Sequence, residues 1–137
     1  MKYDGRITFD TPMTYEEASS KKLGFPLPKG CSNVTYAEVA DWQLHDVYAR
    51  FEAPVDVCLR HMDTVLAWHD AMYKTNTSYP KAEITNSMRG GGDLTITAPW
   101  FDLDKLKHGI EAGTNASHQP MIWVAIDRGV FYFHETD

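Results

Sequence analysis

The chain has 137 residues, of which 43% are hydrophobic and 23% charged, and it carries a net charge of −6. This length and composition predict one folded domain rather than a disordered segment, and the scattered basic residues make nucleic acid a poor partner. No apolar run approaches membrane-spanning length and no hydrophobic leader is visible, so a membrane is not expected and a cytoplasmic location is the default, with a removed leader left open.

The first elements predicted along the chain are a strand, a short helix and a second strand. Residues 5–10 alternate apolar and polar side chains, which indicates a strand with one buried face. Thr14 and Glu17 have the spacing of a capping box, in which each side chain accepts the other residue's backbone N–H. A helix of about ten residues is expected to follow. Residues 33–40 alternate again and predict a strand that turns back into the next one.

Residues 46–73 form the organising segment, which is a strand followed by the longest helix. The apolar face of the strand consists of Val47, Ala49, Phe51 and Ala53. Pro54 suits the first turn of a helix, and at about 100° per residue the helix over residues 54–73 has a wide apolar arc. We expect that arc to cover the apolar face of the strand. His61 and His69 break the pattern, because both fall within or beside the apolar arc.

The second half of the chain predicts two hairpins separated by a helix. Residues 83–88 and 94–98 are strand candidates joined by a glycine-rich turn. Residues 103–112 carry apolar side chains at helical spacing and predict a helix. Residues 121–126 are almost entirely apolar and residues 130–134 alternate, so we expect a central strand and its hairpin partner.

These elements together predict an α+β fold in a single domain over residues 1–137. Their order is β-α-ββ-α-ββ-α-ββ, which favours a mostly antiparallel sheet of about six to seven strands with two or three helices on one face. The sequence carries no phosphate loop, dinucleotide fingerprint or nucleophile elbow, and no cofactor is expected. No family signature is evident, so function has to be inferred from side chains on this fold.

One group of candidate functional residues lies on the apolar side of the long helix. Cys58 and His61 are spaced i, i+3, where they can ligate zinc or copper, although no CxxC or HExxH spacing assigns a metal site. His69 would act as an acid or base with a partner from the sheet. The candidate partners are His45, Asp46 and Tyr48. The alternative is that the cysteine and the histidines are ordinary core residues.

A second group consists of aromatic residues that an uncovered sheet face would expose. They are Tyr48, Trp123 and Tyr132. If helices cover only one face, these side chains form a surface for a small apolar ligand, a protein partner or a second copy of the chain. A second layer of core over that face is the alternative. Arg89 precedes three glycines whose amides can form an anion-binding nest, although a hairpin turn explains the same residues.

Two functions are therefore expected from the sequence. The first is a non-catalytic module that binds a small ligand or a protein through the aromatic sheet face or through a pocket under the 54–73 helix. The second is a small enzyme or metal-binding protein with its site around His69, His61 and Cys58, with Asp46 or His45 opposite. The geometry around His69 discriminates between them, because an acid–base group needs a partner held in place.

Overall fold

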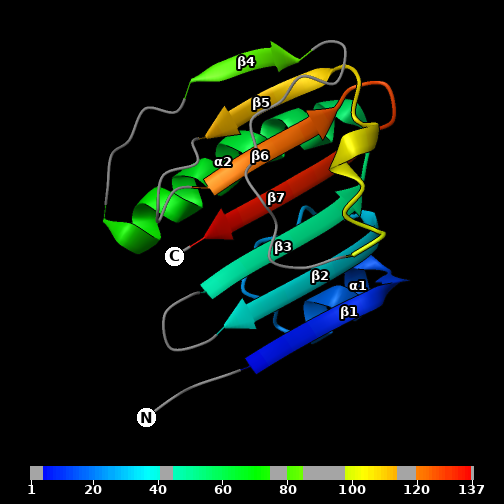
Figure 1. The fold of residues 1–137 in the computed structure, drawn as a ribbon, viewed down its shortest axis with the longest axis vertical. Coiled ribbons are helices and arrows are strands. Elements are labelled where there is room, and N and C mark those ends of the chain that lie inside the picture. Colours follow the sequence, from blue (N-terminus) through cyan, green and yellow to red (C-terminus); the bar gives the residue numbers. More distant parts are fainter. Residues whose placement is uncertain (1–4, 41–44, 75–79, 85–97, 114–119, 137) are drawn as a thin grey trace.

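The computed structural model describes residues 5–40, 45–74, 80–84, 98–113 and 120–136. These residues form a seven-stranded antiparallel sheet with the order β1-β2-β3-β7-β6-β5-β4 (Figure 1). The strands are β1 (Gly5–Met13), β2 (Ser32–Ala40), β3 (His45–Glu52), β4 (Lys81–Ile84), β5 (Gly109–Gly113), β6 (Pro120–Ala125) and β7 (Val130–Thr136). Two α-helices in the described part, α1 (Tyr15–Ser20) and α2 (Val55–Tyr73), accompany the sheet. The α+β class and the antiparallel sheet expected from the sequence are confirmed.

α2 lies against the sheet face that contains the apolar side of β3 (Figure 1). Side chains from both elements meet in one core, which includes Val47, Ala49, Phe51, Cys58, Met62, Val65 and Leu66. The helix begins after Pro54 and ends where Lys74 adopts a left-handed conformation with φ 54°. The helix therefore lies on the predicted face of the sheet, but it packs chiefly over β6 and β7 and reaches β3 through contacts such as that of His61 with Phe51.

α1 lies over the same face, beside β1 and β2, and its Ala18 enters the core shared with α2. The capping box is present, since the Thr14 N–H donates to Glu17 Oε1 at 2.9 Å and the Glu17 N–H donates to Thr14 Oγ1 at 3.1 Å. The helix is shorter than expected and ends at Ser20, because Lys22 turns the chain with φ 53°. Both helices are therefore on one side of the sheet, as predicted.

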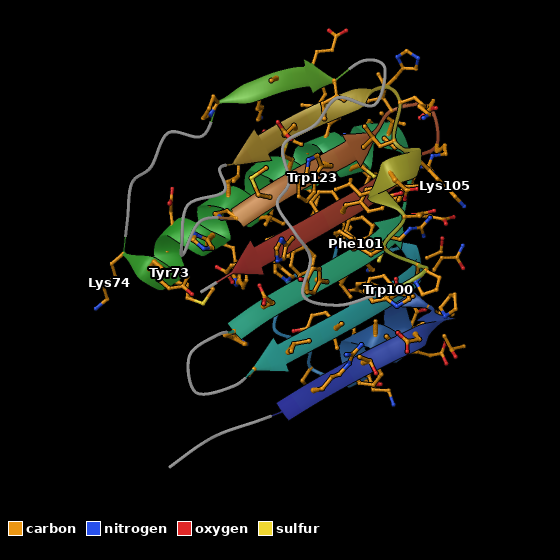
Figure 2. The ribbon with its side chains drawn as sticks, in the orientation of Figure 1. Tyr73, Lys74, Trp100, Phe101, Lys105 and Trp123 are labelled. Carbon is orange, nitrogen blue, oxygen red and sulfur yellow. The ribbon has the colours of Figure 1, made fainter. Side chains whose placement is uncertain are left out.

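The opposite face of the sheet is covered by residues 98–106. This segment includes a single turn of 3-10 helix, η1 (Leu103–Lys105), and it runs across the sheet on the side away from α2. The segment contributes Phe101, Leu103 and Leu106 to a second core cluster. Figure 2 shows Phe101 over the strands on this side. The sheet therefore has core layers on both faces.

The aromatic residues that were expected on an open face belong to this second core. Tyr48, Trp123 and Tyr132 are each 0% exposed, so the expectation of an open aromatic surface at these positions is wrong. The polar atoms of Trp123 and Tyr132 are satisfied inside the layer, since Trp123 Nε1 donates to Glu111 Oε1 at 2.8 Å and the Tyr132 hydroxyl donates to Asp102 Oδ1 at 2.7 Å. The alternative of a second layer of core is the one that the structure supports.

The helix predicted over residues 103–112 is also wrong. The chain makes only the short turn η1 and then enters β5, which lies between β4 and β6. Gly109 lies so close to β6 that a Cβ atom there would be 2.1 Å from the carbonyl oxygen of Val124. Such a close approach of two backbones is a role of glycine in strands, and the strand pairing outweighs the helical spacing of three apolar residues. The third helix of the predicted order is absent from the described part, and β5 takes its place.

The two predicted hairpins of the second half have different outcomes. The hairpin of β6 and β7 is confirmed, and both strands lie in the middle of the sheet with β6 buried on both faces. The strand expected over residues 83–88 begins earlier, as β4, and pairs with β5. Residues 85–97 lie outside the described residues, so the hairpin expected there stays a prediction. Neither α1 nor α2 combines the length and the apolar character that crossing a bilayer requires.

Candidate functional site

Cys58 and His61 are neighbours on the buried side of α2, and each is held by a backbone carbonyl group. The Cys58 thiol donates to the carbonyl oxygen of Ala53 at 3.6 Å. Nε2 of His61 donates to the carbonyl oxygen of Pro26 at 2.8 Å, because a carbonyl group can only accept. Burial raises the pKa of Cys58 to about 11, and burial lowers the pKa of His61 against the opposing effect of the Pro26 bond. Both side chains are therefore neutral near pH 7 and pack as core residues.

The metal site that the spacing of Cys58 and His61 suggested lacks further ligands. Among the described residues, no three histidine, cysteine, aspartate or glutamate side chains gather closely enough to hold a metal ion. Structural zinc sites use four such ligands, so this pair alone does not form one. The anion contact expected at Arg89 lies outside the described residues.

His69, near the C-terminal end of α2, is 1% exposed and is hydrogen-bonded through Nε2 to Oε2 of Glu135. The sequence predicted a partner for His69 in the sheet but sought it in β3, whereas the partner observed is on β7. The ring of Tyr73 lies with its centroid 4.6 Å from that of the imidazole, at 35° (Figure 2 labels Tyr73). The second ring nitrogen of His69, Nδ1, is buried and has no hydrogen-bond partner within the described part of the chain.

His134, the residue before Glu135, faces the other side of the sheet because side chains alternate along a strand. Its Nε2 atom lies 3.1 Å from Oδ1 of Asp46, and its ring stacks on Tyr48 with centroids 4.3 Å apart and planes at 7°. The side chain of Asp46 is 2% exposed and that of His134 is 10% exposed. Burial lowers the pKa of His134, although the hydrogen bond and the charge of Asp46 oppose the shift. The imidazole of His134 is therefore neutral at pH 7 and contacts the buried side chain of Asp46.

Asp46, His69, His134 and Glu135, which we call the histidine–carboxylate cluster, lie at the end of the sheet where β3 begins and β7 ends (Figure 1). They make up four of the six buried polar or charged residues in the described part, the others being Thr35 and His61. Burying ionisable groups costs free energy unless they are paired, so such groups rarely gather in a core without a function. The cluster is therefore the candidate functional site of this chain.

A more exposed polar group lies beside the cluster on the face that α2 covers. Nε2 of His45 is 2.8 Å from Glu38 Oε2, with side chains 40% and 30% exposed, and the Tyr36 hydroxyl donates to Glu38 Oε1 at 3.2 Å. Val47 lies directly between Glu38 and Glu135 in the strand register, which separates the Cα atoms of the two glutamates by about 10 Å. Burial, and next the charge of Glu38, raise the pKa of Tyr36, so its hydroxyl stays protonated.

A separate polar network around Asp102 holds the 98–106 segment on the sheet. Nε of Arg50 donates to Asp102 Oδ1 at 3.1 Å, next to the Tyr132 bond, and Arg128 donates to the Tyr132 hydroxyl at 2.9 Å. Burial raises the pKa of Asp102, but the bond from Tyr132 and the charge of Arg50 outweigh it and bring the pKa below its usual range. Burial and the Asp102 bond raise the pKa of Tyr132 to about 12. Each member is paired within the network, which makes its role structural.

His134 and Glu135 are the cluster residues that sequence reasoning missed. The sequence does contain a signal, because two ionisable residues end an otherwise apolar strand at residues 130–133. The contacts of these two residues depend on tertiary structure. The pairing of β7 with β3 brings His134 to Asp46, and the packing of α2 brings His69 to Glu135. Asp46 and His69 were both expected to act as acid or base residues, but they lie on opposite faces of the sheet in two separate pairs.

Comparison with protein-family models, with curated proteins and with solved structures gives no match. The geometry of the site is therefore the basis for its function. Two histidine–carboxylate pairs lie one on each face of β7, and their members differ in exposure.

Proposed function

We propose that this chain is a small-ligand-binding module in which His69, on the buried side of α2, holds the polar group of the ligand. One observation carries the proposal: Nδ1 of His69 is buried without a partner in the described part of the chain, while Glu135 fixes the opposite ring nitrogen. A buried polar atom without a partner costs about 1–3 kcal/mol. A ligand that hydrogen-bonds to Nδ1 recovers that free energy, which favours an occupied site.

Glu135 determines which hydrogen bond the ligand makes. A carboxylate only accepts, so Nε2 of His69 carries a proton, and the tautomer that has its single proton there leaves Nδ1 as an acceptor. The ligand therefore presents an O–H or N–H donor. The rings of Tyr73, at 4.6 Å, and Trp68, at 6.5 Å between centroids, flank the imidazole and favour a flat apolar body next to that donor. Hydroxylated aromatic molecules combine both features.

Phenol and benzene are matched probes for this proposal, because they share a ring and differ in the hydrogen-bond donor. We expect phenol to shift the ring ¹⁵N and ¹H NMR signals of His69 in a saturable way and benzene to leave them unchanged. The saturable shifts of neighbouring signals should disappear in His69→Phe. They should persist in His61→Phe, because His61 already has its own acceptor at Pro26. Equal binding of both probes, or phenol binding that survives His69→Phe, would contradict the proposal.

Acid–base catalysis by Asp46 and His134 is the second candidate function that we propose. The gradient of exposure in this pair favours it, since the carboxylate is 2% exposed and the imidazole 10% exposed. A buried carboxylate keeps one ring nitrogen protonated and leaves the other to exchange a proton with a bound molecule. The lowered pKa of His134 supports the same role, because the ring is then in its basic form at neutral pH.

Hydrolysis of p-nitrophenyl acetate tests this second function without knowledge of the natural substrate. We expect turnover above the buffer rate, loss of that turnover in His134→Gln, and a decrease of at least about tenfold in Asp46→Asn. His108→Gln is the control, because His108 is an exposed histidine outside the cluster. No turnover in the wild type, or an equal decrease in the control, would exclude catalysis by this pair.

A further inference from the structure

The outer edge of β1 is a long sheet edge. β1 has nine residues and pairs with β2 on one side, and within the described ranges no strand pairs with its other side. The strand at the opposite edge, β4, has only four residues. The outward N–H and C=O groups of a long edge strand are a template for another strand, and proteins usually protect such edges. The edge of β1 is therefore a candidate interaction surface.

The side chains of β1 divide cleanly between its two faces. Ile7 and Phe9 lie on the side of α1 and α2, since they pair with residues of β2 whose side chains face the helices. Arg6, Thr8 and Asp10 lie on the other side, where Asp10 accepts a hydrogen bond from the indole N–H of Trp100. Ile7 is 49% exposed and is one of three exposed large apolar residues in the described part. One face of the edge is thus apolar, and the other carries one cation and one anion.

We propose that β1 pairs with β1 of a second copy of this chain, antiparallel, about a two-fold axis at Thr8. In this register Arg6 faces the partner's Asp10, and Asp10 faces the partner's Arg6. On the other side of the sheet Ile7 faces the partner's Phe9, and Phe9 faces the partner's Ile7. Two ion pairs and two apolar contacts form at once, because the sequence around Thr8 is complementary to itself.

Neighbouring registers lack this complementarity. Residues directly opposite each other in an antiparallel pair lie on the same face of the sheet. The two-fold axis therefore passes between the two copies of one residue, which face each other. An axis at Ile7 would set Arg6 against Thr8, and an axis at Phe9 would set Arg6 against Pro12. Neither arrangement pairs opposite charges. Compared with the neighbouring registers, the charge pattern therefore favours the register about Thr8, and it favours an identical strand as the occupant.

The irregular end of β1 limits the length of this pairing. The register of β1 against β2 shifts between Phe9 and Met13, and Pro12 within that stretch has no backbone N–H to donate. The regular part before the shift ends at Phe9, so it contains Arg6, Ile7 and Thr8, and Asp10 is the first residue of the irregular stretch. A short interface of this kind buries little area, so we expect a dimer that dissociates at about micromolar concentration.

Sedimentation of the full chain between about 1 and 200 µM tests the pairing. We expect a monomer–dimer equilibrium in the wild type. Arg6→Asp and Asp10→Arg each place like charges opposite one another at two positions, and each should weaken the dimer by about tenfold or more. An equimolar mixture of the two variants should form a heterodimer at least as tight as the wild-type dimer, because every opposed pair is then of opposite charge.

Two further variants keep the outcome decisive. Lys29→Asp reverses an exposed charge outside β1 and should leave the dimer unchanged. Because Asp10→Arg also removes the bond from Trp100, the double variant Arg6→Asp with Asp10→Arg is expected to dimerise again if the fold is intact, with circular dichroism as the check. A monomer at 200 µM overturns the proposal, as does a dimer that Arg6→Asp does not weaken or a mixture of single variants that stays monomeric.

Discussion

His61 and His69 are two histidines on the buried side of one helix, and they differ in what they bind. His61 is 6% exposed and donates to the carbonyl oxygen of Pro26. His69 is 1% exposed and is bonded to the carboxylate of Glu135. A carbonyl group has no charge to titrate, so the first pair is a neutral packing contact. The second pair joins two ionisable groups, which is the arrangement of sites that bind or move protons.

The comparison shows that a histidine in an apolar arc is informative only together with its partner. Sequence periodicity places both residues in the core and cannot separate them. His61 is flanked by rings, with Phe51 and Phe131 at 5.5 and 5.4 Å between centroids, as expected of a core side chain. The free ring nitrogen of His69 has no such explanation in the described part of the chain. Variants of both residues and of their surroundings test this distinction.

Removal of the carboxylate from the His69 pair is expected to have the largest effect. Glu135→Ala takes away one member of a buried ionisable pair and should lower the free energy of unfolding by about 3 kcal/mol, as urea denaturation measures it. Glu135→Gln keeps an acceptor oxygen and should cost less. Glu83→Ala, on the exposed strand β4, is the control and should have little effect. If Glu135→Ala costs no more than the control, the pair is not an important contact.

Replacement of His61 is expected to lower the free energy of unfolding by a smaller amount. His61→Leu keeps the apolar volume but leaves the Pro26 carbonyl without its donor, so we expect a loss of about 1 kcal/mol in the same assay. Its effect should add to that of Glu135→Ala within about 0.5 kcal/mol, because the two sites share no partner. His69→Leu and Glu135→Ala should instead be strongly non-additive. Additivity in both double variants would remove the distinction between the two histidines.

Protonation of His61 is expected to contribute to the pH dependence of stability. Burial lowers the pKa of His61 in the folded state, so the unfolded chain takes up the proton first as the pH falls below about 6.5. Stability is therefore complete above pH 7 and declines as the pH falls from about 6.5 towards the folded pKa. His134 has a lowered pKa too and contributes in the same direction. Urea titrations from pH 7.5 downwards should show a smaller decline in His61→Leu, and an unchanged decline would contradict the assignment.

The smallest effect is expected for an ion pair on the solvent side of the same helix. Arg60 and Asp56 are 3.1 Å apart, and their side chains are 71% and 70% exposed. Because water and salt screen such a pair, Arg60→Ala should lower the free energy of unfolding by only about 0.3 kcal/mol. A cost comparable to that of Glu135→Ala would mean that burial does not decide the strength of charge pairs in this protein.

Local periodicity predicted the elements in which each strand or helix has one clear buried side. β2, β3, α2 and β7 follow from it, because their apolar residues repeat every two or every three to four positions, whereas β6 was predicted from its unbroken apolar run. The segment over residues 103–112 failed since Leu103, Leu106 and Ile110 have helical spacing but are shared between different layers. Leu103 and Leu106 enter the second core, whereas Ile110 packs with the helix-side core. Spacing along the chain does not show which layer a side chain joins.

The site was less accessible to prediction than the fold. Periodicity identified His69 as an anomaly, and Asp46 was considered as an acid or base. The hydrogen-bond partner expected for each of them was wrong. The true pairs join positions far apart in sequence, His69 with Glu135 and Asp46 with His134, and they depend on a strand register that the sequence does not state. A polar pair at the end of an apolar strand is the signal that would have indicated β7.

β7 is the last strand in chain order, yet it lies in the middle of the sheet between β3 and β6. A nascent polypeptide leaving the ribosome therefore holds two incomplete ribbons, β1-β2-β3 and β6-β5-β4, until residues 130–136 emerge. The inner edges of both ribbons have no partner strand during that interval, and unpaired strand edges of this kind favour aggregation. A premature stop before residue 130 would leave both ribbons without the strand that joins them.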